Sequence, residues 1–216
     1  MIGDIQAEPA ARAARTLTDE GLTAAPVIVD VTGEDQVQAA VQHCLDAYRH
    51  LDVFMNNAGI TRDATMRKMS LEQFRSVVDF HQQGCWLGTR AAAAVMREQA
   101  AGSIVNISST SGKTGMLGQT NFSAAKVGMV GLAKAAAKEI ARYGVRVNVV
   151  RPGLVRTPMT ESMRQDIWDQ KLAEVSMARG GDPDEVANVV LFLASDLSPI
   201  WADRCLRCMD TNDRPH

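Results

Sequence analysis

Four short motifs place hydrogen-bonding or proton-carrying side chains beside the ends of apolar runs. Asn56-Asn57-Ala58-Gly59 follows one apolar run, Ser109 follows a second, and Pro152-Gly153 follows a third. Lys126 stands near the start of an alanine-rich segment. Amide, hydroxyl and ammonium groups all bind polar ligands through hydrogen bonds. These motifs are therefore the candidate functional residues of the chain.

Apolar runs rich in β-branched residues predict the strands that would carry these motifs. The run Pro26–Val31 is typical of a strand buried on both faces. Further strands are expected at residues 51–56, 103–107, 145–150 and 205–209. Because strands alternate with helical segments at this spacing, the sequence predicts an α/β fold with a doubly wound parallel sheet.

Capping residues mark where the helices should begin. Thr32 with Asp35, and Ser70 with Gln73, have capping-box spacing. The helix that opens at Ser70 should run to about residue 99, and an alanine-rich helix should span 122–143. The segment 182–185 reads Asp-Pro-Asp-Glu, which predicts the start of the last helix.

Composition excludes several classes of protein. The 216 residues are 46% hydrophobic and carry a formal net charge of -2. That balance fits one globular domain, and it leaves no basic stripe for binding nucleic acid. No apolar run reaches the length of a membrane helix, so no membrane partner is expected. Four cysteines are too few for a disulfide scaffold, which favours a reduced, cytoplasmic protein.

Cys205 and Cys208 have the spacing of a metal or redox pair. The chain has no second such pair, and on a strand the two side chains would face opposite sides. No metal site is therefore expected.

In their order and spacing, the four motifs resemble those of the short-chain dehydrogenase/reductase family. The resemblance runs from about residue 3 to about residue 200. It is strongest for the 3-oxoacyl-acyl-carrier-protein reductase-like branch, on Asn-Asn-Ala-Gly-Ile-Thr-Arg-Asp at 56–63 and Gly-Gln-Thr-Asn at 118–121. It implies a Rossmann-like sheet and an oxidoreductase that uses NAD or NADP.

The resemblance also implies a role for each matching residue. Ser109 would hydrogen-bond the substrate carbonyl, and Lys126 would hold the nicotinamide ribose. Asp4 would accept the ribose hydroxyls of the adenosine half and favour NAD over NADP. The other residues implied to line the cofactor cleft are Asp30, Val31, Asn57, Ala58, Gly59, Pro152, Gly153 and Thr157.

Phe122 stands where the family has its catalytic tyrosine. In that chemistry a phenol gives a proton to the carbonyl as hydride arrives, and phenylalanine has no proton to give. General acid catalysis contributes about 10²–10⁴-fold. Tyr48 and Tyr143 lie too far along the chain to replace the phenol. The resemblance therefore predicts an enzyme with impaired catalysis.

His81 stands where the family usually has an asparagine that holds a water in a proton relay. A neutral imidazole can also hold a water. Two interpretations of His81 therefore stay open: the proton relay is retained, or it is lost.

The family also opens with a strand, a Thr-Gly-x-x-x-Gly-x-Gly turn and a helix, which bind the pyrophosphate. None of the 16 glycines recreates that pattern. The resemblance thus predicts a single, incomplete domain over 1–216, from a truncated chain or a misassigned start. Without the central strand, a buried sheet edge would be unpaired and the fold marginal or rearranged. The missing turn also counts against cofactor binding.

The carboxyl end departs from the family as well. Relatives have Thr-Gly before the last strand and Asp-Gly-Gly after it, where this chain has Ala202-Asp203 and Met209-Asp210-Thr211. Glycine to aspartate is unfavourable at a turn that needs positive φ. Residues 211–216 are expected to form a frayed tail.

Two hypotheses from different classes follow. The first is an oxidoreductase acting on a small carbonyl or alcohol substrate, with an acyl-carrier-linked substrate among the alternatives. The second is a non-catalytic relative, either a partner subunit in a homo- or hetero-oligomer of family subunits or a vestigial gene product.

Overall fold

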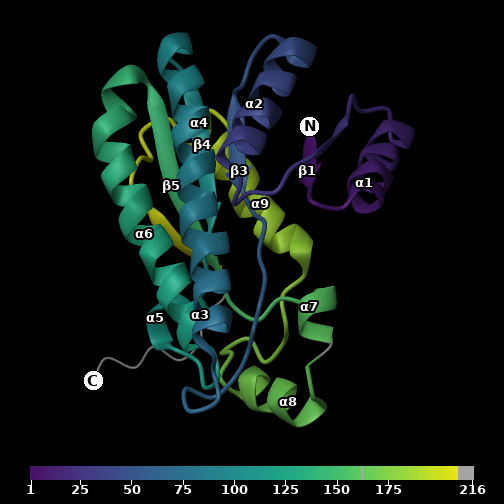
Figure 1. Cartoon of the computed structure of the whole chain (residues 1–216), viewed down its shortest axis with the longest axis vertical. Helices are drawn as coiled ribbons and strands as arrows, with labels where there is room; N and C mark the ends of the chain where they lie inside the picture. The colour runs from purple at the N-terminus through teal and green to yellow at the C-terminus, as the bar shows by residue number, and fades with distance from the viewer. Residues whose placement is uncertain (162, 209–216) are drawn as a thin grey trace.

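Parallel strands form two separate sheets in the computed structural model, which describes residues 1–161 and 163–208 (Figure 1). Strands β1 (Ile2–Asp4) and β2 (Pro26–Ile28) pair in a two-stranded sheet. The larger sheet has the order β3-β4-β5-β6, and all its pairs are parallel. Its strands are β3 (Val53–Asn56), β4 (Gly102–Ile107), β5 (Val145–Pro152) and β6 (Cys205–Cys208). The predicted α/β fold is confirmed.

Helices cover both faces of the larger sheet. On one face lie α4 (Gly84–Gln99) and α6 (Thr120–Ile140), with α2 (Glu34–Tyr48) packed against α4, and on the other lies α9 (Pro183–Ala194). Alternate residues of β5 supply the two cores. Val147 and Val149 pack with α4 and α6, whereas Val150 packs with Leu193 of α9. This alternation is the period of two that a strand buried on both faces requires.

The remaining helices are shorter or lie beside the smaller sheet. Helix α1 (Ala7–Asp19), which sequence reasoning missed, packs on β1 and β2. Its buried Ala10 and Ala14 are four residues apart, and this helical spacing was the sequence signal that could have predicted α1. The others are α3 (Leu71–Val78), α5 (Ser111–Thr114), α7 (Pro158–Glu161) and α8 (Gln165–Ala173).

Most of the capping predictions are confirmed. The hydroxyl of Ser70 accepts from the backbone N–H of Gln73, and the Gln73 side chain accepts from the Ser70 N–H, as a capping box requires. Glu185 likewise accepts from the backbone N–H of Asp182 at 2.9 Å. The prediction for Thr32 is wrong: its hydroxyl donates to Asp30, and α2 begins at Glu34 without a side-chain cap.

The long helix expected from Ser70 to Gln99 contains a π-helical segment at Asp79–Gln83, between α3 and α4. Such segments insert one residue per turn and often occur at functional sites. Sequence reasoning placed the helix correctly and missed this change of pitch. His81 lies in the π-helical segment, and its side chain is buried.

The sheet is divided between β1 and β3, where the resemblance places the family's first strand. The edge expected to be buried is only partly so, because Val53 and Met55 of β3 are 40% and 46% exposed whereas Phe54 and Asn56 are half-buried. The segment after β2 contacts the π-helical segment and the first residue of α4. Val31 touches Gly84, and Gln83 donates to the carbonyl of Thr32.

The turn before β6 has the backbone that the family comparison implied. Asp203 has φ of 61°, in the left-handed region, and its N–H donates to the carbonyl of Val147. Aspartate is one of the few residues that tolerate this conformation. Residues 209–216, which include the substituted Asp-Gly-Gly position and the predicted tail, lie outside the described residues.

Two glycine-to-alanine changes in helices should have opposite effects on stability. A Cβ at Gly88 would lie 2.3 Å from Asn56 Oδ1 and 2.8 Å from Phe54, so Gly88→Ala should cost about 1–3 kcal/mol. A Cβ at Gly131 meets nothing within 4 Å, so Gly131→Ala should stabilise by about 0.5–1 kcal/mol. Urea unfolding of both variants measures this, and equal effects would contradict the close packing of α4 on β3.

Candidate functional site

The carboxyl ends of β3 and β4 are joined by a hydrogen bond between two side-chain amides. Asn56 and Asn106 are register partners, and Asn56 Nδ2 donates to Asn106 Oδ1 at 2.8 Å and to Thr89 Oγ1 at 3.2 Å. Asn106 is fully buried. Because a buried polar group left unpaired is costly, these bonds fix the edge at which the predicted motifs meet.

Lys126 is held against the end of β4. Its ammonium donates to the carbonyl of Ile107 at 2.7 Å, and the hydroxyl of Ser108 donates to the backbone carbonyl of Lys126 at 2.6 Å. Burial lowers the pKa of Lys126 to about 8. Lys126 therefore remains mostly charged at pH 7, close to the point at which it could lose its proton.

Ser109 lies in the segment between β4 and α5 and is half-buried. Its Oγ accepts from the backbone N–H of Ser111 at 3.2 Å, and the neighbouring Thr110 N–H donates to the carbonyl of Pro152 at 3.0 Å. The same strand ends thus bring together the predicted residues Ser109, Lys126 and Pro152-Gly153.

Phe122 lies beside Lys126 and His81 at the start of α6. The Lys126 ammonium is 5.4 Å from the centroid of the phenyl ring, and the ring centroid of His81 is 5.2 Å away in an edge-to-face contact. The backbone N–H of Phe122 donates to Asn121 Oδ1. The ring is therefore held firmly at the place where the resemblance expects a phenol, without a hydroxyl.

His81 is a buried, neutral imidazole. Its Nε2 lies 2.9 Å from the carbonyl of Ile60, to which it can donate, and its Nδ1 is buried with no partner among the described residues. Burial, and secondly the charge of Lys126, lower the pKa of His81 to about 4. Nδ1 is thus a free acceptor beside Phe122, which suits the relay interpretation of this position.

The loop after β3 approaches His81 closely. A Cβ at Gly59 would lie 3.0 Å from His81 Cε1, so a side chain there would displace the imidazole. Asn57, Ala58 and Gly59 are all exposed at this edge of the sheet, as a cofactor cleft requires.

Asn121 and Gln119 are the positioning residues that sequence reasoning missed. Asn121 is fully buried, and its Nδ2 donates to the carbonyls of Arg62 and Gln73. Gln119 Nε2 donates to Asp63 Oδ2 at 2.8 Å. These bonds fasten the start of α6 to the loop after β3. The available signal was that 56–63 and 118–121 together carried the resemblance, although sequence reasoning assigned no role to Gln119 or Asn121.

The residues expected near the adenosine half of a cofactor make local bonds. Asp30 Oδ1 accepts from the backbone N–H and the hydroxyl of Thr32, and Asp4 Oδ1 accepts from the N–H of Gln6. Asp4 is the last residue of β1, and Asp30 follows β2 with Val31 beside it. At the other end of the site, Thr157 and Thr160 hydrogen-bond each other.

Comparison with known proteins identifies the family. The family described as enoyl-(acyl carrier protein) reductase matches residues 1–202. The chain belongs to the short-chain dehydrogenase/reductase family.

Among curated members of this family, an uncharacterised oxidoreductase of Mycobacterium bovis is 56% identical over 198 residues, which are 92% of this chain and 80% of the relative. A 3-oxoacyl-[acyl-carrier-protein] reductase of Thermotoga maritima is 42% identical over 80% of this chain and 70% of the relative. An acetoacetyl-CoA reductase of an Acinetobacter species is 42% identical over 79% and 68%. Within the part of the chain that the structure describes, no helix is long and apolar enough to cross a membrane.

The buried imidazole should make the short-chain dehydrogenase/reductase fold sensitive to acid. Because the pKa of His81 falls from 6.5 to about 4 on folding, the unfolded chain binds more protons between these values. The contribution of neutral His81 to the free energy of unfolding is present above pH 6.5 and is lost as the pH falls toward 4. Between pH 7 and pH 5 the free energy of unfolding should therefore fall by about 2 kcal/mol. Urea unfolding of His81→Asn at the two pH values should lack this loss. His43→Asn, at an exposed position on α2, should retain it, and identical profiles for all three proteins would refute the effect.

Proposed function

We propose that this family member acts on a carbonyl or alcohol with NAD(H) or NADP(H), and that Phe122 impairs its turnover. The observation that carries the proposal is the packing of the Phe122 ring beside Lys126 and His81, at the carboxyl ends of the strands. The surrounding groups have the chemistry of a reductase site, and the proton donor is missing.

The residues present fit the nicotinamide end of the cofactor. Lys126 offers a buried ammonium for ribose hydroxyls, and the Nδ1 of His81 is an unsatisfied acceptor in the same site. Pro152, Gly153 and Thr157 follow β5 and would pack against the nicotinamide. When bound, the reduced cofactor supplies a hydride. The missing Gly-rich turn leaves the pyrophosphate without its usual binding segment in these 216 residues.

The chain's own residues would orient the substrate and hold the proton relay. Ser109 would donate a hydrogen bond to the carbonyl oxygen, and His81 would hold a water by accepting at Nδ1. Lys126 would hold the ribose and, through its charge, favour an anionic neighbour. With phenylalanine at 122, the developing alkoxide receives no proton from a side chain of that position, which costs about 10²–10⁴-fold.

The substrate class follows from the relatives. One is named a 3-oxoacyl-[acyl-carrier-protein] reductase and another an acetoacetyl-CoA reductase. We therefore infer a 3-oxoacyl thioester, carried by an acyl carrier protein or by coenzyme A, as the substrate of this chain.

A partner subunit without catalysis is the second candidate, and exposed apolar side chains favour it. Trp86 on α4 is 47% exposed, and Val127 on α6 is 52% exposed. Family members often form oligomers, and the segments 71–99 and 122–143 would supply a four-helix interface with another family subunit. In that role the chain would associate with a partner and show no turnover of its own.

Restoring the phenol should restore activity. Phe122→Tyr should raise the rate of NAD(P)H oxidation with acetoacetyl-CoA by about 10²–10⁴-fold. Phe192→Tyr adds the same hydroxyl on the opposite face of the sheet and should change nothing. Adding Ser109→Ala to Phe122→Tyr should remove the gain. No gain from Phe122→Tyr in a chain that binds cofactor would favour the partner subunit.

Cofactor binding should be measured by titrating the folded chain with NADH and NADPH and following nicotinamide fluorescence. We expect saturable binding that prefers NADH, because Asp4 would repel the 2′-phosphate of NADPH. Asp4→Ser should reduce that preference about tenfold, whereas Asp19→Ser, at the exposed end of α1, should leave it unchanged. Circular dichroism establishes folding, and a folded chain that binds neither nucleotide would refute the oxidoreductase proposal.

A further inference from the structure

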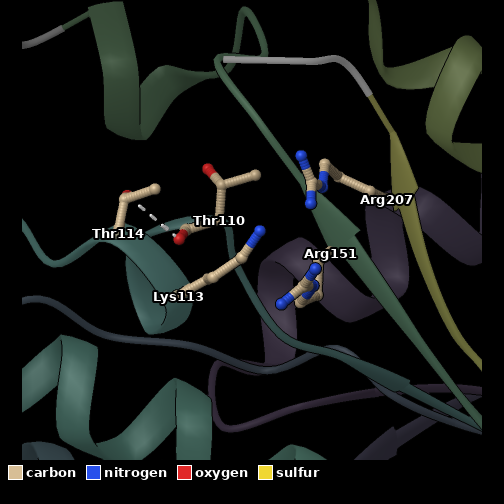
Figure 2. A pocket seen from close by; sticks show the side chains of 5 residues that line it. All are labelled: Thr110, Lys113, Thr114, Arg151 and Arg207. Atoms are coloured by element: carbon tan, nitrogen blue, oxygen red, sulfur yellow. Dashed lines mark hydrogen bonds between the residues drawn. The ribbon is translucent and has the colours of Figure 1, made fainter. Parts of the chain in front are cut away.

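Two features near the candidate site have little part in the proposed function. One is the hollow between α5 and the ends of β5 and β6, which Figure 2 shows; it is too small to hold a water molecule and so offers no room for a ligand. The other is the π-helical segment Asp79–Gln83, of which the proposed function uses His81 alone. Because π-helical turns often occur at functional sites, the contacts that hold this segment are informative.

Three consecutive side chains of the π-helical segment contact three different parts of the chain. His81 Nε2 lies 2.9 Å from a backbone carbonyl in the loop after β3. Gln82 Nε2 donates to the carbonyl of Ala124 in α6 at 3.0 Å. Gln83 Nε2 donates to the carbonyl of Thr32, in the segment after β2, at 3.2 Å. The extra residue of this rare helical turn is thus held by side-chain bonds to the loop, to α6 and to the segment after β2.

The bond of Gln82 to α6 depends on a glycine. In an α-helix, the carbonyl of one residue points toward the residue four positions later, and Gly128 stands four positions after Ala124. A Cβ at residue 128 would overlap Gln82 Nε2 and lie 2.7 Å from its Cδ. Because residue 128 has no side chain, the amide of Gln82 can reach the Ala124 carbonyl.

The π-helical segment also sets the direction in which His81 points. An α-helix turns by about 100° per residue. If the segment relaxed to an α-helix by losing its extra residue, the side chains before it would rotate by about that angle relative to α4. The His81 ring would then leave its edge-to-face contact with Phe122, and the unpartnered Nδ1 would leave the candidate site.

We propose that Gln82 is a positioning residue of the candidate site: its hydrogen bond to Ala124 holds the π-helical segment against α6 and thereby keeps the His81 imidazole beside Phe122. Gln82 is half-buried, whereas Gln83 is exposed, so water competes more with the bond of Gln83 than with that of Gln82. Gln82 acts through His81 rather than on the substrate. The use of His81 in a proton relay rests on the proposed function, whereas its position does not.

The pKa of His81 reports where the imidazole lies. Burial, and secondly the charge of Lys126 in α6, lower this pKa from 6.5 to about 4, and the hydrogen bond with the Ile60 carbonyl opposes the shift. The ring neighbours Phe80, on the same segment, and Phe122, on α6, carry no charge. If His81 turned toward water, the cost of burying its charged form would fall, and the pKa would return toward 6.5.

The test is an NMR titration of the imidazole resonances in the folded chain, with His81→Asn to assign the signal of His81. Gln82→Met keeps an unbranched side chain of similar length and removes the donor. We expect this variant to raise the pKa of His81 from about 4 to about 5 or higher, which is at least a tenfold increase in proton affinity.

Gly128→Ala tests the same contact from the side of α6, because its Cβ would displace the Gln82 amide, and it should raise the pKa of His81 in the same way. Gly131→Ala makes the same change in the same helix, where a Cβ meets nothing within 4 Å, and should leave the pKa at about 4. Val150→Ala lowers stability in the core on the α9 side and should also leave the pKa unchanged.

Circular dichroism establishes that each variant is folded. The proposal is overturned if His81 keeps a pKa of about 4 in either folded variant, Gln82→Met or Gly128→Ala. It is also overturned if Val150→Ala raises the pKa equally, because general loss of stability would then be the cause, or if His81 of the parent chain titrates near 6.5. The titration needs no nucleotide, thioester or turnover, so failure here is distinguishable from failure of the proposed reductase.

Discussion

The hydrogen bond between the Lys126 ammonium and the Ile107 carbonyl is the constraint around which the site is organised. It joins α6 to the end of β4, and the Lys126 side chain that makes it is buried. A buried ammonium needs compensation, because desolvation disfavours its charge. Here one carbonyl and the face of the Phe122 ring supply it. Burial keeps His81 neutral by lowering its pKa, and the charge of Lys126 acts in the same direction.

Phenylalanine at 122 therefore loses one function and keeps another. The ring still packs edge-to-face against His81 and still offers its π-face to Lys126. What is lost is a titratable proton, which contributes to catalysis and little to packing. In the proposed function, the site thus keeps the packing of the ring while the proton donor is absent.

Local signals in the sequence predicted most of the elements, and non-local packing explains the misses. The capping box at Ser70 depends on residues three apart and could be read directly. The π-helical segment at 79–83 could not, because its pitch places His81 against a loop distant in sequence. The motifs located Ser109 and Lys126, but the bonds of Asn121 to Arg62 and Gln73 join segments whose proximity only the fold reveals.

The polar side chains of the candidate site are fixed by the larger sheet and by the helices packed on it. Asn56 of β3 donates to Asn106 of β4, and Lys126 of α6 donates to the carbonyl of Ile107 at the end of β4. The carboxylates of Asp4 and Asp30 belong to the smaller sheet, which reaches the larger one through contacts such as Val31 with Gly84. In the proposed function, chemistry at the nicotinamide end would depend on the larger sheet, and affinity for the adenosine end would depend on how the smaller sheet is held. The two contributions are separable in this chain, since different elements carry them.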